Sequence, residues 1–299
     1  MLTSSCRSGS YSSVAWVAGQ TGDRAPPGQH RLSEGVGPAG LGEEDRLVDL
    51  REGFWSLRGS LRLGGIVDIG TQCALVRLAS GNFVFLDSYP LTDAIRAQVD
   101  ALTDGGTKVE AILNLHPFHT LHCEWMHSAF PQAKLYGTAR HVDHLPELPW
   151  ETLRCEHDAL AELYAEDFAF SVPRGVTLVS DDESVHFSSV LALHRASGTV
   201  HVDDTFVYLR KGFPLSLLPF TGRFGFHPTL AKALEPRAGA ADEFREWAIE
   251  LGIDWADAGC IAAAHNALLP LDAEELPELI GAALGRVKPV LDAHRAEYG

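Results

Sequence analysis

Three segments of this 299-residue chain carry side chains that proteins use to bind metal ions. Residues 115–122 have the pattern HxxHxxH, residues 186–205 begin at a histidine and end beside paired aspartates, and residues 264–266 read Ala-His-Asn. Neutral imidazole and carboxylate groups are common ligands of zinc, iron and manganese. Each segment follows or ends a short apolar run, so a strand end can point its polar side chain into a shared cleft. The pattern predicts one site for one or two metal ions.

Composition narrows the class of protein. The formal net charge of −16 argues against DNA or RNA as a partner, because phosphate binding needs a basic face. A hydrophobic fraction of 45% is enough for a substantial core. No apolar run reaches the roughly 18 residues of a membrane span, and the patch 14–18 is too short for a signal-peptide core. The five cysteines are scattered without a CxxC pair, which favours free thiols. We therefore expect a cytoplasmic protein that binds neither nucleic acid nor membrane.

The chain divides into a short leading segment and one folded domain. Residues 1–47 are rich in Ser, Gly and Pro and lack periodicity, which predicts a disordered N-terminal segment. Residues 48–299 contain the regular apolar patterns and are predicted to form a single domain.

The elements of that domain alternate in two similar halves. Hairpin-like runs over 54–88 precede a helix over 91–102, and a strand over 109–115 ends at the histidine cluster, which is where ligands bind in open α/β sheets. The remaining predicted strands cover 134–137, 176–179, 190–194, 199–202 and 260–264, and the remaining predicted helices cover 124–130, 151–164, 240–251 and 273–284. The order suggests two packed sheets with helices outside.

These landmarks together resemble the metallo-β-lactamase-fold hydrolase superfamily from Phe54 to Leu284. Residues 85–88 resemble that family's early strand ending in Asp-Thr-Gly, and residues 114–122 stand where it has Thr-His-x-His-x-Asp-His. Residues 185–190 resemble its Gly-His-Thr-x-Gly-Ser segment, residues 197–205 its strand ending in Gly-Asp-Thr, and residues 263–266 its final strand ending in a ligand histidine. The resemblance implies an α+β fold, an αββα sandwich of two mixed sheets packed face to face with helices outside. It also implies a dinuclear site, usually zinc, with a bound hydroxide as nucleophile.

The resemblance also implies a ligand set. The first ion would take His116, His119 and His186 with Asp204, and a second would rely on His122, His265 and Asp204. HxxHxxH lacks the aspartate of the family motif, so the second ion is expected to be weaker or absent. Asp203 replaces the glycine that precedes the family's bridging aspartate. Asp204, Asp203 and Glu124 are the carboxylates assigned to catalysis, and Asp203 or Asp87 is expected to orient ligand histidines.

Three functions follow from this reading. The first is a metal-dependent hydrolase of an ester, lactone, thioester or amide of a small molecule, using zinc, with iron or manganese as alternatives. The missing aspartate supports a second, a binding protein that kept the fold and lost catalysis. The third is an iron-dependent oxidoreductase, since histidine-rich ligation suits iron as well as zinc. Outside the site, we expect His141 to be a surface or capping group and His201 to pack or hydrogen-bond within its strand.

Overall fold

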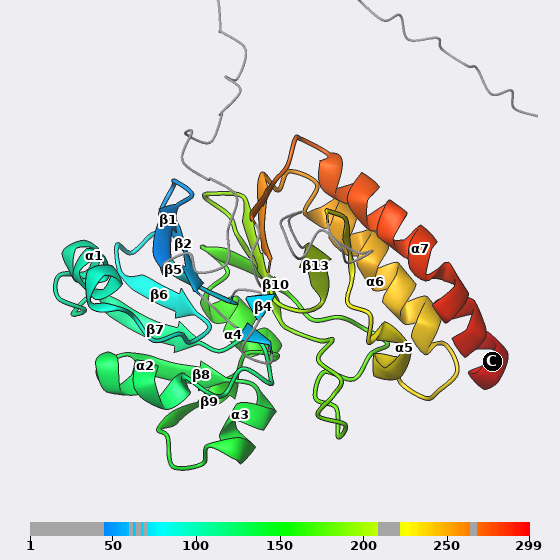
Figure 1. Ribbon diagram of the computed structural model, residues 1–299, viewed down its shortest axis with the longest axis horizontal. Coiled ribbons are helices and arrows are strands. Elements are labelled where there is room, and N and C mark those ends of the chain that lie inside the picture. Colours follow the sequence, from blue (N-terminus) through cyan, green and yellow to red (C-terminus); the bar gives the residue numbers. More distant parts are fainter. Residues whose placement is uncertain (1–44, 60–61, 64–66, 69–70, 209–221, 264–267) are drawn as a thin grey trace, which may run out of the picture. The chain divides into compact units, whose positions relative to one another are not determined.

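Two mixed β-sheets lie at the centre of the chain (Figure 1). The computed structural model describes residues 45–299 apart from 60–61, 64–66, 69–70, 209–221 and 264–267, and every described residue belongs to the unit 38–299. The first sheet has the order β1-β2-β5-β6-β7-β8-β9, with β1 Arg46–Asp49, β2 Phe54–Gly59, β5 Thr71–Arg77, β6 Phe83–Leu86, β7 Val109–Leu113, β8 Lys134–Gly137 and β9 Trp150–Arg154. The second has the order β10-β11-β12-β15-β16, with β10 Phe168–Ser171, β11 Leu191–His194, β12 Thr199–Val202, β15 Cys260–Ala263 and β16 Leu268–Pro270.

Strand alternation divides the core into separate apolar layers. On β5, Cys73 and Leu75 belong to an outer cluster, whereas Ala74 and Val76 belong to the cluster that also contains Ala192 of β11 in the other sheet. Successive side chains of a strand point to opposite faces, so one apolar run supplies both layers. The sheets therefore pack face to face, and each has a second apolar face for helices to cover.

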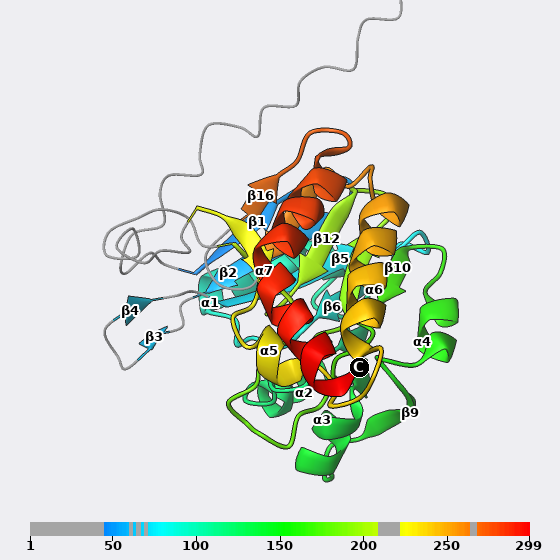
Figure 2. The ribbon, with the colours of Figure 1, turned by 90° about the vertical axis from the view of Figure 1, so that its right-hand side faces the viewer.

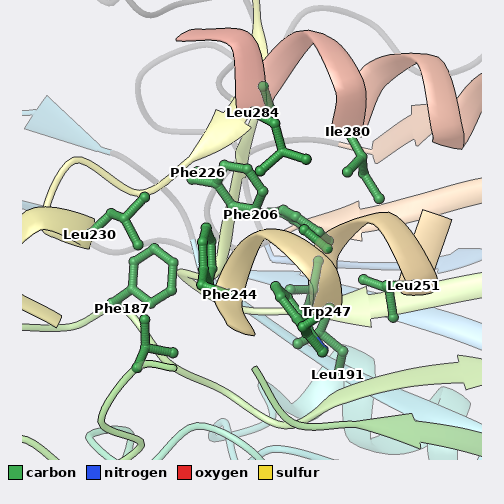
Figure 3. Close-up of a cluster of buried hydrophobic side chains, with 14 of the residues drawn as sticks. Phe187, Leu191, Phe206, Phe226, Leu230, Phe244, Trp247, Leu251, Ile280 and Leu284 are labelled. Carbon is green, nitrogen blue, oxygen red and sulfur yellow. The ribbon is translucent and has the colours of Figure 1, made fainter. Parts of the chain in front are cut away.

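Helices cover both outer faces (Figure 1). Ile95 of α1 (Asp93–Thr103) and Met126 of α2 (Cys123–Ala129) join the outer cluster of the first sheet. Against the second sheet, Phe244 of α6 (Ala240–Asp254) and Ile280 of α7 (Glu275–Tyr298) pack in one cluster with Leu191 (Figure 3). Figure 2 shows α6 and α7 side by side over this face. The predicted αββα sandwich is confirmed.

Short elements complete the described chain. The helices are α3 Ala139–His144, α4 Asp158–Leu163 and α5 Leu230–Ala233, and the small hairpins pair β3 Arg62–Leu63 with β4 Val67–Asp68 and β13 Phe206–Tyr208 with β14 Phe224–Phe226. None of the helices in the described ranges has the combination of length and apolar composition that crossing a membrane requires.

Three local predictions were wrong. The acidic helix over 151–164 is instead β9 followed by α4, because β9 pairs in parallel with β8 and this tertiary pairing outweighs helix propensity. Residues 176–179 form only an isolated bridge, between Val176 and Leu234. The last helix does not end near Leu284 but continues to Tyr298. Burial of Leu291 against α6 stabilises the additional turns.

Candidate metal centre

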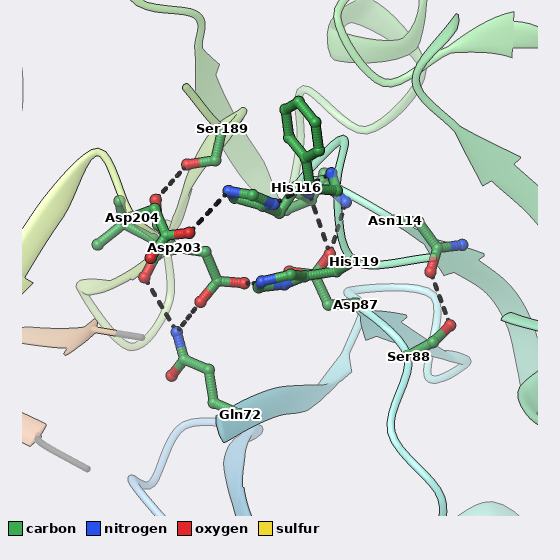
Figure 4. Close-up of polar contacts among 12 residues, drawn as sticks. Gln72, Asp87, Ser88, Asn114, His116, His119, Ser189, Asp203 and Asp204 are labelled. Carbon is green, nitrogen blue, oxygen red and sulfur yellow. Dashed lines mark hydrogen bonds and ion pairs between the residues drawn. The ribbon is translucent and has the colours of Figure 1, made fainter. Parts of the chain in front are cut away.

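Three strand ends supply the polar side chains of the candidate centre (Figure 4). Asp87 follows β6, His116 and His119 follow β7, and Asp203 and Asp204 follow β12. Asp204 has a positive φ of 40°, so the chain turns sharply after Asp203. This turn directs the two neighbouring carboxylates toward different histidines.

Two histidine–aspartate contacts define the centre. Nε2 of His116 lies 3.1 Å from Oδ2 of Asp204, and Nδ1 of His119 lies 3.2 Å from Oδ2 of Asp203. The two imidazole rings stack with centroids 4.0 Å apart. Nevertheless, neither His116 Nε2 nor Asp203 Oδ2, both buried, has a hydrogen-bond partner among the described residues. Close approach without hydrogen-bond geometry is what ligand atoms around a shared ion would show, because lone pairs then point at the ion and not at each other.

The ligand atoms are close enough to share an ion. One atom from each of His116, His119 and Asp204 lies within 4.8 Å of the others, and the same holds for Asp87, His119 and Asp203. Imidazole nitrogen and carboxylate oxygen are the donors that zinc, iron and manganese accept. The residues present therefore fit a metal ion of this kind.

Asp87 anchors the histidine loop from behind. Its Oδ1 accepts hydrogen bonds from the backbone N–H groups of Leu115, at 2.7 Å, and His116, at 3.2 Å. Its Oδ2 lies 2.9 Å from Nε2 of His201, which is buried within β12 and hydrogen-bonds as expected. Because both oxygens of Asp87 are engaged in this way, we interpret it as a residue that orients the loop.

Charge in the centre is unevenly distributed. Burial and the neighbouring His119 lower the pKa of His116, which favours the neutral, metal-binding imidazole. Burial also disfavours a charged His119, but the carboxylates of Asp203, Asp204 and Asp87 outweigh it and raise the pKa of His119 to about 9. Burial would likewise raise the pKa of Asp203, yet the contact with His119 keeps it well below the usual range. Without a metal ion, His119 and Asp203 therefore form a charged pair.

The other predicted site residues occupy different positions. His186 is half-buried, with its ring centroid 4.6 Å from Phe118 and 6.2 Å from His116, so it lies beside the centre but in neither group of three. His122 precedes α2 and packs edge-on against Tyr89. Glu124 is exposed on the first turn of α2. His265 lies outside the described residues.

A hydrogen-bonded turn holds the His186 segment against the aspartates. Ser189 Oγ donates to the backbone oxygen of Asp203 at 2.6 Å, and Thr205 Oγ1 donates to the backbone oxygen of Phe187 at 3.0 Å. Phe187 itself is buried in the core under α6. Residues 187–189, which follow His186, are therefore fixed against the turn that carries the aspartates.

Sequence reasoning missed three supporting residues, Arg58, Gln72 and His141. Arg58 and Gln72 are directly paired across β2 and β5 and are almost fully buried. Both are polar residues within mainly apolar strands. This pattern could have identified them, since buried polar residues are rare unless they have partners. His141 was predicted to be a surface or capping group; it does cap α3, through a reciprocal capping box with Thr138, but it is fully buried.

The buried His141 predicts a measurable acid sensitivity. Burial lowers the pKa of His141 to about 3, below its ordinary 6.5, so this histidine stays neutral in the folded state while the unfolded chain takes up a proton. Stability from this group is therefore present above pH 6.5 and is lost as the pH falls toward 3. Between pH 7 and pH 5 the loss is about 2 kcal/mol. Urea unfolding of the metal-free protein at both pH values checks this.

The matched variant is His141→Gln, because glutamine completes a capping box at the same helix position but does not titrate. We expect the variant to lose about 2 kcal/mol less than the natural chain between the two pH values. Equal losses in both proteins would show that His141 does not contribute to the acid sensitivity.

Comparisons with known proteins identify the fold. No family sequence model and no curated protein sequence matches the chain. Among solved structures, the metallo-β-lactamase from Erythrobacter litoralis with β-mercaptoethanol in the active site is 17% identical, with a TM-score of 0.51, over 80% of this chain and 97% of that chain. The metallo-β-lactamase FIM-1 from Pseudomonas aeruginosa in the mono-zinc form is 11% identical, with a TM-score of 0.50, over 82% and 96%. The chain therefore has the metallo-β-lactamase fold, as the resemblance of its motifs predicted.

Proposed function

We propose that the chain is a metal-dependent hydrolase that acts on an ester, lactone, thioester or amide of a small molecule. The observation that carries this proposal is the convergence of His116, His119 and Asp204, with a buried His116 nitrogen that has no hydrogen-bond partner among the described residues. The similar fold of metallo-β-lactamases adds to the proposal without deciding the substrate.

In this proposal His116, His119 and Asp204 hold the ion, with His186 closing the set from its neighbouring loop. A bound zinc ion supplies a nucleophilic hydroxide near neutral pH. Asp87 keeps the histidine loop in place through two backbone amides. His122 and His265 are predicted ligands, and Glu124 is a predicted catalytic carboxylate. These three roles remain predictions.

One specific observation favours a second function. The group His116, His119 and Asp204 is a two-histidine, one-carboxylate set, the composition found in non-heme iron oxygenases. An iron-dependent oxidoreductase is therefore the alternative to the hydrolase.

Elemental analysis of protein purified without added metal or a histidine tag tests the proposal. We expect about one equivalent of zinc, together with hydrolysis of at least one member of a panel of activated esters, lactones and thioesters. Predominant iron with oxygen consumption would favour the oxidoreductase. If the protein contained no metal and took up none on reconstitution, both enzyme proposals would be wrong and a binding protein would be favoured.

A further inference from the structure

Asp203 has one carboxylate oxygen held from behind and one directed into the centre. Oδ1 accepts a hydrogen bond of 3.0 Å from Nε2 of Gln72. Oδ2 lies 3.2 Å from Nδ1 of His119 and has no hydrogen-bond partner among the described residues. Asp203 is only 2% exposed, so solvent does not satisfy this oxygen. A buried carboxylate oxygen without a hydrogen-bond donor is costly unless a cation faces it; without a metal ion that cation is the protonated His119.

Gln72 is fixed so that its amide nitrogen faces Oδ1 of Asp203. Its Nε2 also lies 3.0 Å from the backbone oxygen of Val202 and 2.9 Å from that of Ala262. Its Oε1 accepts a hydrogen bond of 2.6 Å from Arg58, which donates a second bond of 3.0 Å to the backbone oxygen of Ala263. An oxygen bonded to a guanidinium cannot exchange places with the NH2 group, because a guanidinium has no acceptor. The amide therefore has one orientation.

This arrangement joins the two sheets at the centre. Arg58 and Gln72 belong to β2 and β5 of the first sheet, whereas the groups they bind belong to β12 and β15 of the second. Arg58 is only 6% exposed, and burying a guanidinium is expensive unless it has partners and a nearby negative charge. Asp203 provides that negative charge, and Gln72 hydrogen-bonds to both side chains. Figure 4 shows Gln72 beside Asp203 and Asp203 beside His119, and Arg58 donates to Gln72 from the other side.

We propose that Asp203 is itself a metal ligand in this chain, and that Arg58 and Gln72 are the positioning residues that direct its free oxygen into the centre. The inference rests on the proposed metal-dependent function. It also accounts for the altered first motif, because Asp203 supplies a carboxylate near His119 in a chain whose HxxHxxH loop contains none. Gln72 occupies Oδ1, so Oδ2 is the oxygen that binds the ion.

The alternative role for Asp203 is to orient His119 through a hydrogen bond. The geometry argues against it, since the contact at 3.2 Å leaves Oδ2 without a hydrogen-bond partner among the described residues. The two roles make different predictions. If Asp203 binds the ion, a different metal-binding side chain at position 203 will change the spectrum of the bound metal. If Asp203 only orients His119, that replacement will not produce such a change.

Replacing Asp203 with cysteine and zinc with cobalt provides this test. We expect cobalt-loaded Asp203→Cys to show a thiolate-to-cobalt absorption band in the near ultraviolet, because a coordinating thiol is deprotonated. Cobalt-loaded natural protein is the control, since Cys123 near the centre is a thiol within 3.4 Å of Asn114 Oδ1 and its pKa is raised to about 12 by burial. Cobalt binding without the band in Asp203→Cys would overturn the ligand role.

Zinc affinity, measured by competition with a chromogenic chelator, tests the positioning residues and covers the case in which Asp203→Cys binds no cobalt. We expect Gln72→Met and Arg58→Met to weaken zinc binding about 10- to 100-fold, the usual cost of losing a partner behind a metal ligand. Asp203→Asn should weaken it at least as much, and Arg58→Lys should recover part of the loss.

The matched control is Thr103→Val, which removes a buried hydroxyl that bonds Val99 at the end of α1, away from the centre. It should keep the natural zinc affinity even if its unfolding temperature falls. Natural affinity in Asp203→Asn would overturn the inference and leave the proposed function intact. A natural protein that binds neither zinc nor cobalt would instead contradict both.

Discussion

Replacing His116 with alanine is expected to reduce zinc affinity more than about 100-fold, beyond the usual cost of changes behind a metal ligand. His116 is fully buried, its Nε2 lies 3.1 Å from Asp204, and burial favours the neutral imidazole that binds metal. The variant removes a proposed ligand that water cannot easily replace, because the position is closed to solvent. Chelator competition and elemental analysis of the purified variant measure the loss.

The control for this variant is His157→Ala. His157 is exposed before α4 and makes no side-chain capping bond, so its removal should leave zinc binding unchanged. If His116→Ala kept the natural zinc content, the histidine–aspartate contacts would be structural and the proposed centre would be wrong. Unfolding of the metal-free variant should be measured alongside, so that loss of folding is not mistaken for loss of a ligand.

The sequence predicted the layers of the fold because strand alternation is a local signal. The runs over β5, β6 and β7 place apolar residues on both faces, and that pattern requires layers above and below. The failure at β9 has the opposite cause. Residues 150–154 form a strand because β8 lies beside them in space, and no pattern within the segment records that neighbour.

The candidate centre was predictable to the extent that its proposed ligands follow strand ends. His116 and Asp204 were identified from their places after apolar runs, and the structure brings them to 3.1 Å. The supporting residues were not predictable in the same way. Gln72 and Arg58 act across the two sheets, on Asp203 and on the backbone of β15, and these contacts join positions more than 100 residues apart. Only the packing of one sheet on the other creates them.

Replacing Asp87 with alanine is expected to lower the free energy of unfolding of the metal-free protein by about 3–5 kcal/mol. The variant leaves the buried amide groups of Leu115 and His116 without their acceptor and His201 Nε2 without its carboxylate. Asp87 also has a positive φ of 62°, a conformation that aspartate tolerates better than alanine. Urea denaturation, followed by circular dichroism, measures the change.

Two further variants separate the causes of this loss. Asp87→Asn keeps an oxygen for the two backbone amides and tolerates the positive φ, so it should lose less stability than Asp87→Ala, the difference reporting the loop anchor. Asp143→Ala removes an exposed carboxylate from α3 and should change stability by no more than about 0.5 kcal/mol. An Asp87→Ala variant as stable as Asp143→Ala would mean that the histidine loop holds its position without Asp87. The orienting role that we assign to Asp87 would then be wrong.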